Sequence, residues 1–285
     1  MKVLSKVKGD LEFNRGLTSL IDVLKNIAVA QFRTLERKLK SFEELVSSVE
    51  SFFEFLDIAK VSHPFLSPRT KRQIVVAVTS DTGLLGGLNM KVVNTAIEEL
   101  NKIPGKLIVI GERGRLRAQE LNIPATSFSG IGMEEEERYS QAAQLRDYIV
   151  DNFFKEPTGY VKVVYPRPIS LTVQRVDTVS FLPYAPAKKY SFAEEGIIDI
   201  ITESRRGDIA EYLIYIWMGE RLFEIFGLSR LAEFGARFVH LQESSQKLSD
   251  LSKKLRLEYF RISHELIDRN MRDLFAARLL YEGKK

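Results

Sequence analysis

The distribution of proline is the feature of this sequence that most constrains its fold. All nine prolines lie between Pro64 and Pro186, so neither the first 63 of the 285 residues nor the last 99 contain one. Proline lacks the main-chain N–H that a helix needs and clashes with the preceding turn, so it breaks helix interiors. Both ends of the chain are therefore free to form long continuous helices.

Apolar residues in the N-terminal segment recur in alternating steps of four and three. The series has two polar breaks and runs through Leu17, Ile21, Leu24, Ala28, Gln31, Leu35, Lys38, Phe42, Leu45, Val49, Phe52, Leu56 and Ala59. Such spacing is typical of a heptad seam, the stripe along which two helices pair. It predicts a helix over about residues 17–61, roughly 65 Å long at about 1.5 Å per residue.

A second seam lies near the C-terminus and follows an apolar helical stretch at residues 212–226. Its members are Leu231, Phe234, Phe238, Leu241, Leu248, Leu251, Leu255, Ile262 and Leu266. It predicts a helix over residues 208–281, which Gly219, Gly227 and Gly235 could bend or break. The two terminal helices suit each other as an antiparallel coiled coil, and a helical bundle around an ordinary core is the alternative.

The middle of the chain has short apolar runs separated by turns, the pattern of an α/β domain. The predicted elements are buried parallel strands at residues 73–79 and 106–110, helices at 89–101 and 134–154, and a hairpin of strands at 160–165 and 171–182. We therefore predict an α/β fold in which long terminal helices flank a central Rossmann-like domain. The predicted domain limits are 1–66, 67–190 and 191–285.

Composition excludes several classes of protein. With 45% hydrophobic and 28% charged residues, the chain has the balance of a soluble globular protein. It has no cysteine, which excludes disulfides, thiolate metal sites and Cys nucleophiles. No window approaches the roughly 18 to 20 apolar residues of a membrane span. The net charge of +4 is too small for the dense basic face of a nucleic-acid binder.

The segment at residues 80–89, SDTGLLGGLN, sits where a strand meets a helix, a common place for phosphate-binding loops. Gly83, Gly86 and Gly87 do not form the G-x-G-x-x-G pattern, and no Lys-Ser or Lys-Thr follows at P-loop spacing. A nucleotide site at this loop is therefore the weaker interpretation.

No other cluster predicts chemistry. Arg113, Arg115 and Arg117 are interpreted as a solvated turn leading into a helix, with an anion site as the alternative. The run Glu134 to Glu137 is a solvated helix start, since four consecutive carboxylates on a helix do not converge on a cation. The three histidines, His63, His240 and His264, stand beside no candidate nucleophile. We predict no catalytic residue, cofactor site or metal site.

The loop resembles a motif of the γ subunit of the F-type rotary ATP synthase, S-D-R-G-L-C-G-G-L-N. Eight of its ten residues match, and Thr82 and Leu85 stand in place of the motif's Arg and Cys. Residues 109–128 and 165–184 are also similar to that family. The likeness covers nearly the whole chain, strongly in the middle and weakly at the ends.

The resemblance implies a non-catalytic central rotor shaft. It implies that the paired terminal helices enter the α3β3 catalytic ring, and that the middle domain meets the ε subunit and the membrane c-ring. ATP chemistry would take place on the β subunits. The protein would lie peripherally on the cytoplasmic face of an energy-transducing membrane, or in the matrix or stroma of an organelle, without binding nucleic acid.

The resemblance also implies contact residues. Basic and polar residues off the seam would meet acidic segments of the β subunits, and the candidates are Arg33, Arg37, Lys40, Lys253, Lys254, Arg256, Tyr259 and Arg261. In the loop, Asp81, Gly83, Gly86, Gly87 and Asn89 are the motif residues, expected to be structural.

The terminal helices depart most from the family. Residues 24–31 keep only the small, apolar character of its V-A-A-A-K stretch, and Ser263 and His264 replace an Arg-Gln pair. We therefore expect a divergent or alternative γ subunit of a specialised rotary ATPase. Two other hypotheses remain, a stand-alone α/β nucleotide-binding protein and a coiled-coil scaffold.

Overall fold

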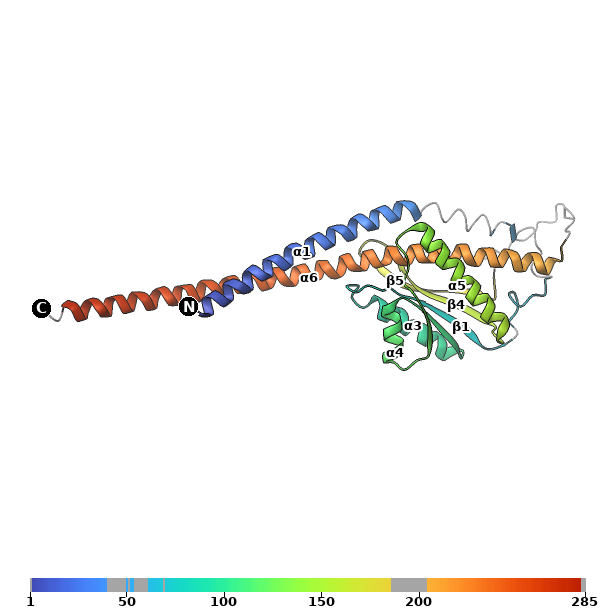
Figure 1. Cartoon of the computed structure of the whole chain (residues 1–285), viewed down its shortest axis with the longest axis horizontal. Coiled ribbons are helices and arrows are strands. Elements are labelled where there is room, and N and C mark those ends of the chain that lie inside the picture. The colour runs from blue at the N-terminus through green and yellow to red at the C-terminus, as the bar shows by residue number, and fades with distance from the viewer. Residues whose placement is uncertain are drawn as a thin grey trace. The chain divides into compact units, whose positions relative to one another are not determined.

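The computed structural model describes residues 2–39, 50, 52–53, 61–68, 70–185 and 204–282. The chain divides into two compact units. The first comprises residues 1–27 and 239–285, and the second comprises residues 28–238. Two helices, α1 (Lys2–Leu39) and α6 (Arg206–Glu282), contribute residues to both units (Figure 1).

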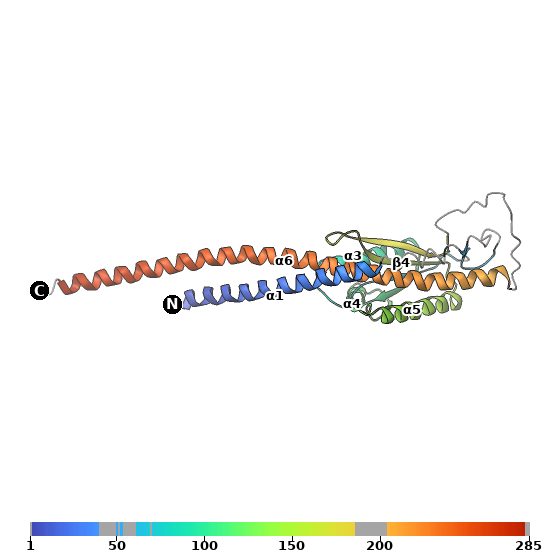
Figure 2. The ribbon, with the colours of Figure 1, turned by 90° about the horizontal axis from the view of Figure 1, so that it is seen from above.

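The first unit is an antiparallel helix pair. The Asn14 side-chain amide on α1 donates a hydrogen bond to the Leu248 carbonyl on α6 at 2.9 Å, and the Ser245 hydroxyl donates to the Asp22 carboxylate at 3.4 Å. The later residue on α1, Asp22, contacts the earlier residue on α6, Ser245, so the two helices run in opposite directions. Both views show them side by side (Figure 1, Figure 2). The predicted pairing is confirmed.

The start predicted for the first helix was wrong. The helix begins at Lys2, about 15 residues before the expected Leu17, and its seam continues toward the N-terminus. Val7 and Asn14 are only 5% and 2% exposed. Because Asn14 is polar, the spacing of apolar residues did not show that the seam extends this far toward the N-terminus. Val61, the predicted end, lies in no helix, and the seam positions at residues 42, 45, 49, 56 and 59 fall outside the described residues.

The second unit is built on a five-stranded sheet with the order β3-β2-β1-β4-β5. The first four strands of this order are parallel, and β5 is antiparallel to β4. The strands are β1 (Gln73–Val78), β2 (Gly105–Ile110), β3 (Ala125–Phe128), β4 (Tyr160–Pro168) and β5 (Gln174–Leu182). The predicted strand, helix, strand unit and the hairpin are confirmed, whereas β3 was not predicted.

Helices cover both faces of this sheet (Figure 1). On one face, Val75 and Ala77 pack with residues of α3 (Leu88–Lys102) and α4 (Glu112–Glu120). On the other, Ile74, Val76 and Val78 pack with α5 (Glu135–Lys155) and with α6. Alternate residues of β1 therefore enter different cores, which explains why residues 74–78 of this strand are all apolar.

The part of α6 that belongs to the second unit packs into the core on one face of its sheet. Ile214, Met218, Leu222 and Ile225 are fully buried there. The helix passes through Gly219, Gly227 and Gly235 without interruption, so it is not broken at these glycines. Among the described residues, no helix is long and apolar enough to span a membrane.

Candidate functional site

The loop at residues 80–89 is joined to its surroundings through Asp81. The Asp81 carboxylate accepts a hydrogen bond from the Glu112 amide, the first residue of α4, at 2.8 Å, and another from the Gly130 amide at 3.1 Å. A carboxylate at a helix N-terminus is favoured by the helix dipole. Asp81 therefore connects the end of β1 to α4 and to the segment that follows β3.

Two glycines allow the end of β1 to lie close to α4 and to the segment after β3. A Cβ atom on Gly130 would lie 2.4 Å from the Asp81 carboxylate, and one on Gly114 would lie 2.3 Å from the Thr79 hydroxyl oxygen. That hydroxyl donates to the Ile110 carbonyl at 2.5 Å and accepts from the Gly114 amide at 3.0 Å. The ends of β1 and β2 are thereby fixed against α4.

Ser80 and Asn89 close the loop at its base. The Asn89 amide group donates to the Ser80 hydroxyl at 2.8 Å, and the Ser80 main-chain N–H donates to the Asn89 side-chain oxygen at 3.2 Å. The Ser80 hydroxyl also donates to the Thr82 carbonyl at 2.8 Å. The polar side chains at the two ends of the loop are therefore bonded to the loop itself.

The motif glycines occupy different environments. Gly86 has a φ of +59°, a left-handed conformation that glycine adopts without strain. A Cβ on Gly83 would meet the guanidinium of Arg113 at 3.0 Å. Gly87 is the N-cap of α3. Leu84, half exposed between them, has a φ of +64°, which is uncommon for a residue with a side chain.

The loop also contacts α6. Leu85 and Leu88 pack against Ala236, and the Arg237 guanidinium donates to the Thr82 hydroxyl at 2.7 Å. One turn earlier on α6, Glu233 is 2% exposed. Burial raises its pKa to about 7, although Arg230 and Arg237 oppose that rise. Sequence reasoning missed this charged cluster. The sequence does contain a signal for it, because Arg230 and Arg237 lie three and four residues from Glu233 inside an apolar run.

The other charged candidates do not converge on a ligand. Arg115 pairs with Glu112 at 2.5 Å, and Arg117 pairs with Glu120 at 2.9 Å, each within α4. The glutamates at 135–137 form the first turn of α5. No group of three or more His, Asp or Glu side chains among the described residues could hold a metal ion.

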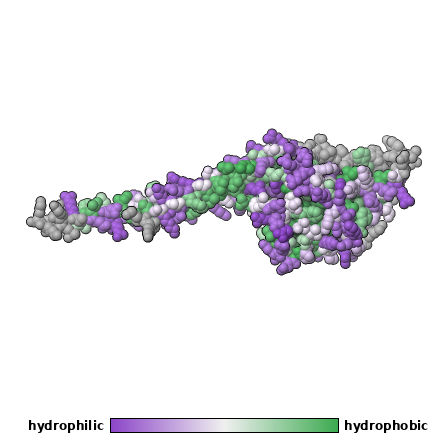
Figure 3. Space-filling view, in the orientation of Figure 1, coloured by the Kyte–Doolittle hydropathy of each residue, from purple (hydrophilic) through white to green (hydrophobic). Residues whose placement is uncertain are grey.

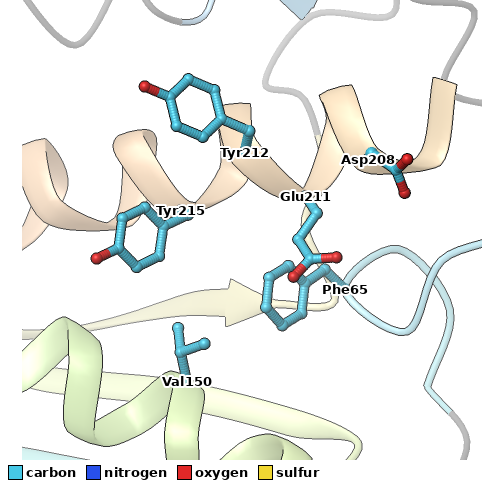
Figure 4. Close-up of a pocket in the computed structure, with 6 residues that line it drawn as sticks. All are labelled: Phe65, Val150, Asp208, Glu211, Tyr212 and Tyr215. Carbon is cyan, nitrogen blue, oxygen red and sulfur yellow. The ribbon is translucent and has the colours of Figure 1, made fainter. Parts of the chain in front are cut away.

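A pocket of about 380 Å³ lies between α6 and α5 in the second unit. Four of its six lining residues belong to α6, and Figure 4 shows Phe65 and Val150 across from that helix. The lining residues are Phe65, Val150, Asp208, Glu211, Tyr212 and Tyr215. Two of them already have partners, because Glu211 lies 3.0 Å from the His63 ring and the Tyr215 hydroxyl donates to Asp147 at 2.7 Å. None of the predicted site residues lines this pocket.

The predicted contact residues on the helices fall into both units. Arg33 and Arg37 belong to the second unit, where they are exposed. The candidates at positions 254, 256, 259 and 261 belong to the first. Of these, Arg261 is largely exposed and pairs with Glu265 at 3.2 Å. Lys40 lies outside the described residues.

A model of the family described as ATP synthase matches residues 5–277. The match includes most of α1, the whole sheet domain and nearly all of α6. The chain belongs to the ATP synthase family. The resemblance that the loop motif indicated is therefore confirmed.

Curated members of the family that resemble this chain include gamma chains. The ATP synthase gamma chain of Pelotomaculum thermopropionicum is 22% identical over 281 residues, 96% of this chain and 97% of that protein. The one from Desulforudis audaxviator is 25% identical over 228 residues, 75% of this chain and 76% of that protein. Identities this low agree with the expected divergence.

Solved structures of ATP synthase share the fold. A chain of the Euglena gracilis mitochondrial enzyme, from a structure of its OSCP, F1 and c-ring in rotational state 3, aligns with a TM-score of 0.72 at 15% identity. That alignment covers all of this chain and 96% of the other. A chain of the same enzyme's rotor in rotational state 1 aligns with a TM-score of 0.66 at 14% identity, covering 93% and 99%.

Proposed function

We propose that this chain is the central rotor shaft, a γ-type subunit, of an F-type ATP synthase or ATPase. In this role it transmits torque between a membrane c-ring driven by ions and an α3β3 catalytic ring. The observation that carries the proposal is the family match over residues 5–277, because it includes both helices of the coiled coil as well as the sheet domain.

The surface of the helix pair is suited to contact without tight binding. On α1, Leu20, Val23 and Ile27 are about half exposed, and Figure 3 shows that hydrophobic residues are visible on the surface of the helix pair. A smooth apolar surface offers few directional bonds to a surrounding ring. On α6, Lys254, Arg256 and Arg261 are exposed cations. We propose that these, together with Tyr259, Arg33 and Arg37, contact acidic segments of the β subunits.

We propose that the chain itself does not catalyse ATP turnover. In support, the polar groups at the base of its glycine-containing loop are engaged with the protein. Asp81 occupies the N-terminus of α4, where a phosphate would otherwise be favoured, and Ser80 and Asn89 are bonded to each other. The motif residues Asp81, Gly83, Gly86, Gly87 and Asn89 then have a structural role.

The remaining partners follow from the same role. We propose that the sheet domain meets the ε subunit and the c-ring, and that the chain is peripheral on the cytoplasmic face of an energy-transducing membrane. In an organelle this side would be the matrix or the stroma.

The test is co-purification from native membranes at endogenous levels. We expect three α-like and three β-like subunits for each copy of this chain, and no ATP hydrolysis by the chain alone. Recovery of the chain without ATPase subunits would refute the proposed function as a rotor shaft. Nucleotide turnover by the isolated chain, lost when Gly86 or Gly87 is replaced by a bulky residue, would favour the stand-alone enzyme instead.

The low identity to curated gamma chains supports a second proposal, that this is the γ subunit of a specialised rotary ATPase. A γ-depleted α3β3 complex from an ordinary ATP synthase should then rotate poorly when this chain is supplied. Equal ATP-driven rotation with this chain and with the native γ subunit would rule out specialisation.

A further inference from the structure

The pocket between α5 and α6 has the size and the lining of a site for a small group. Its volume of about 380 Å³ lies within the range of small-molecule pockets, about 300–1,000 Å³, which are mostly apolar with a few polar groups. Apolar and aromatic side chains form most of its lining, together with the carboxylates of Asp208 and Glu211. The charges of these two carboxylates decide what the pocket can bind.

The Glu211 carboxylate is held in place without being neutralised. Its Oε2 atom lies 3.0 Å from His63 Nε2. The Phe65 main-chain N–H donates to His63 Nδ1 at 3.3 Å, so Nδ1 carries no proton and the ring is the neutral tautomer that donates through Nε2. Figure 4 shows the Glu211 carboxylate directed away from α6 and toward the Phe65 ring. Its negative charge therefore remains available to a ligand.

Asp208 is a second carboxylate without a counter-ion. It is exposed in the first turn of α6, and its side chain forms no hydrogen bond or ion pair with any residue that the structure describes. The cations nearest to it on α6, Arg205 and Arg206, pair with no described carboxylate. Arg146, on α5, is already paired with Asp147 at 2.9 Å. Two negative charges are therefore left at the pocket.

The aromatic part of the lining suits a cation. The Arg146 guanidinium lies over the Tyr215 ring, 3.8 Å from its centre, and the Tyr215 hydroxyl donates to Asp147 at 2.7 Å. The chain thus already places one guanidinium beside an aromatic face and a carboxylate at this pocket. Tyr212, three residues earlier, is 65% exposed, and no described residue stacks on its ring. Such a free ring face attracts cations.

We propose that this pocket binds an organic cation, an ammonium or guanidinium group on an aliphatic stem. The stem packs against Phe65 and Val150. The charged end meets Asp208, Glu211 and the Tyr212 ring. A ligand without charge would bury these carboxylates without a partner, which is unfavourable, and an anion would be repelled by them.

The same cationic group can come from two sources. One is a Lys or Arg side chain of a neighbouring subunit, and the other is a free alkyl cation. The chemistry of the pocket is the same for both. The proposal goes beyond the rotor function and does not depend on it, because binding can be measured on the full chain alone.

The probe is n-butylguanidinium, titrated against the isolated full chain by saturation-transfer NMR, with n-butanol as an uncharged probe that has the same stem. We expect the cation to bind about fivefold more tightly than the alcohol. In Asp208→Asn/Glu211→Gln, which keeps the shape of both side chains, the affinity for the cation should fall by about fivefold, the upper range for an exposed ion pair. The control Glu98→Gln/Glu120→Gln removes two exposed carboxylates from α3 and α4 on the other face of the sheet and should keep the native affinity.

Two further changes test the cavity and the ring separately from the carboxylates. Val150→Phe narrows the pocket while both carboxylates remain, so it should weaken binding of the cation. Tyr212→Leu removes the ring and should weaken binding by about two- to fivefold, whereas Tyr212→Phe keeps the ring and should bind as the native chain does. These variants decide the matter if the double variant does not fold.

The complex purified from native membranes distinguishes the two sources. Binding of n-butylguanidinium to the free chain but not to the complex would identify a side chain of a neighbouring subunit as the occupant, and binding to both would identify a free cation. Equal affinities for n-butylguanidinium and n-butanol, equal affinities of the native chain and the double variant, or no binding by the native chain would overturn the proposal. Failure of the chain to co-purify with α and β subunits would refute the rotor function and leave this binding unchanged.

Discussion

The Glu233 carboxylate accepts a 2.7 Å hydrogen bond from the Arg230 guanidinium, three residues earlier on α6, where only 3% of the Glu233 side chain is exposed. Burial nevertheless raises the pKa of Glu233 from 4.5 to about 7. The folded protein then binds a proton here between those pH values and the unfolded chain does not. The contribution of this bound proton to the free energy of unfolding is complete below pH 4.5 and is lost as the pH rises through 7.

Glu233→Gln should remove this pH dependence. The free energy of unfolding of the native chain relative to the variant should fall by about 3 kcal/mol at most between acid and mildly alkaline pH. Urea titrations of both chains across that range measure the difference. Glu258→Gln, at an exposed position of α6, is the control. Parallel pH profiles for the native chain and Glu233→Gln would show that Glu233 keeps an ordinary pKa.

Asp81→Ala should destabilise the sheet domain. It leaves the main-chain N–H groups of Glu112 and Gly130 without their acceptor, at a cost of about 1–3 kcal/mol. Chemical denaturation of the whole chain measures the loss. Asp151→Ala, which removes an exposed carboxylate paired with Lys155, should cost much less. Equal losses for the two variants would mean that the Asp81 bonds contribute little.

Alanine should act in opposite ways at two helical glycines. A Cβ on Gly235 of α6 would lie 2.5 Å from the Gln174 side chain and 2.8 Å from the Leu171 carbonyl, whereas one on Gly16 of α1 would meet no atom within 4 Å. Gly235→Ala should therefore lower stability by about 1–3 kcal/mol through overpacking. Gly16→Ala should raise it by about 0.5–1 kcal/mol through helix propensity. The melting temperatures should shift in opposite directions, and shifts of the same sign would contradict this packing.

The register of the helix pair can be tested by cross-linking, since the chain has no cysteine. In Asp22→Cys/Ser245→Cys the two thiols replace side chains whose oxygens are 3.4 Å apart. Mild oxidation should join them faster than in Asp22→Cys/Ser249→Cys, whose second position is exposed one turn further along α6. Mobility on a non-reducing gel gives both rates. Equal rates would place α1 in another register.

The sequence predicted those parts of the fold in which apolar residues form a continuous run or recur at helical spacing. The buried strand β1 is a continuous apolar run from Ile74 to Val78, and the α6 seam keeps its spacing for many turns. Strand β3 has no such signal, because Ala125 to Phe128 lie at the sheet edge with three of their four residues exposed. The start of α1 was missed because Asn14, rather than an apolar residue, occupies its buried position.

Only the local part of the candidate site, the loop motif itself, was predictable from the sequence. The motif identified the loop that contains Asp81, but the partners of that loop come from distant segments. Arg237 is 155 residues from Thr82 in sequence, and no local pattern relates the two. Arg230 and Arg237 flank Glu233 at helical spacing in the sequence, but the burial of Glu233 depends on the packing of distant segments and was not predictable.

The bond between Asn14 and Leu248 joins residues separated by 234 positions. A ribosome must therefore complete most of the protein before the partner of α1 exists. In that interval, buried α1 residues such as Val7 have no native surface to pack against. Such exposed apolar surface makes incomplete chains prone to aggregate until α6 has been synthesised.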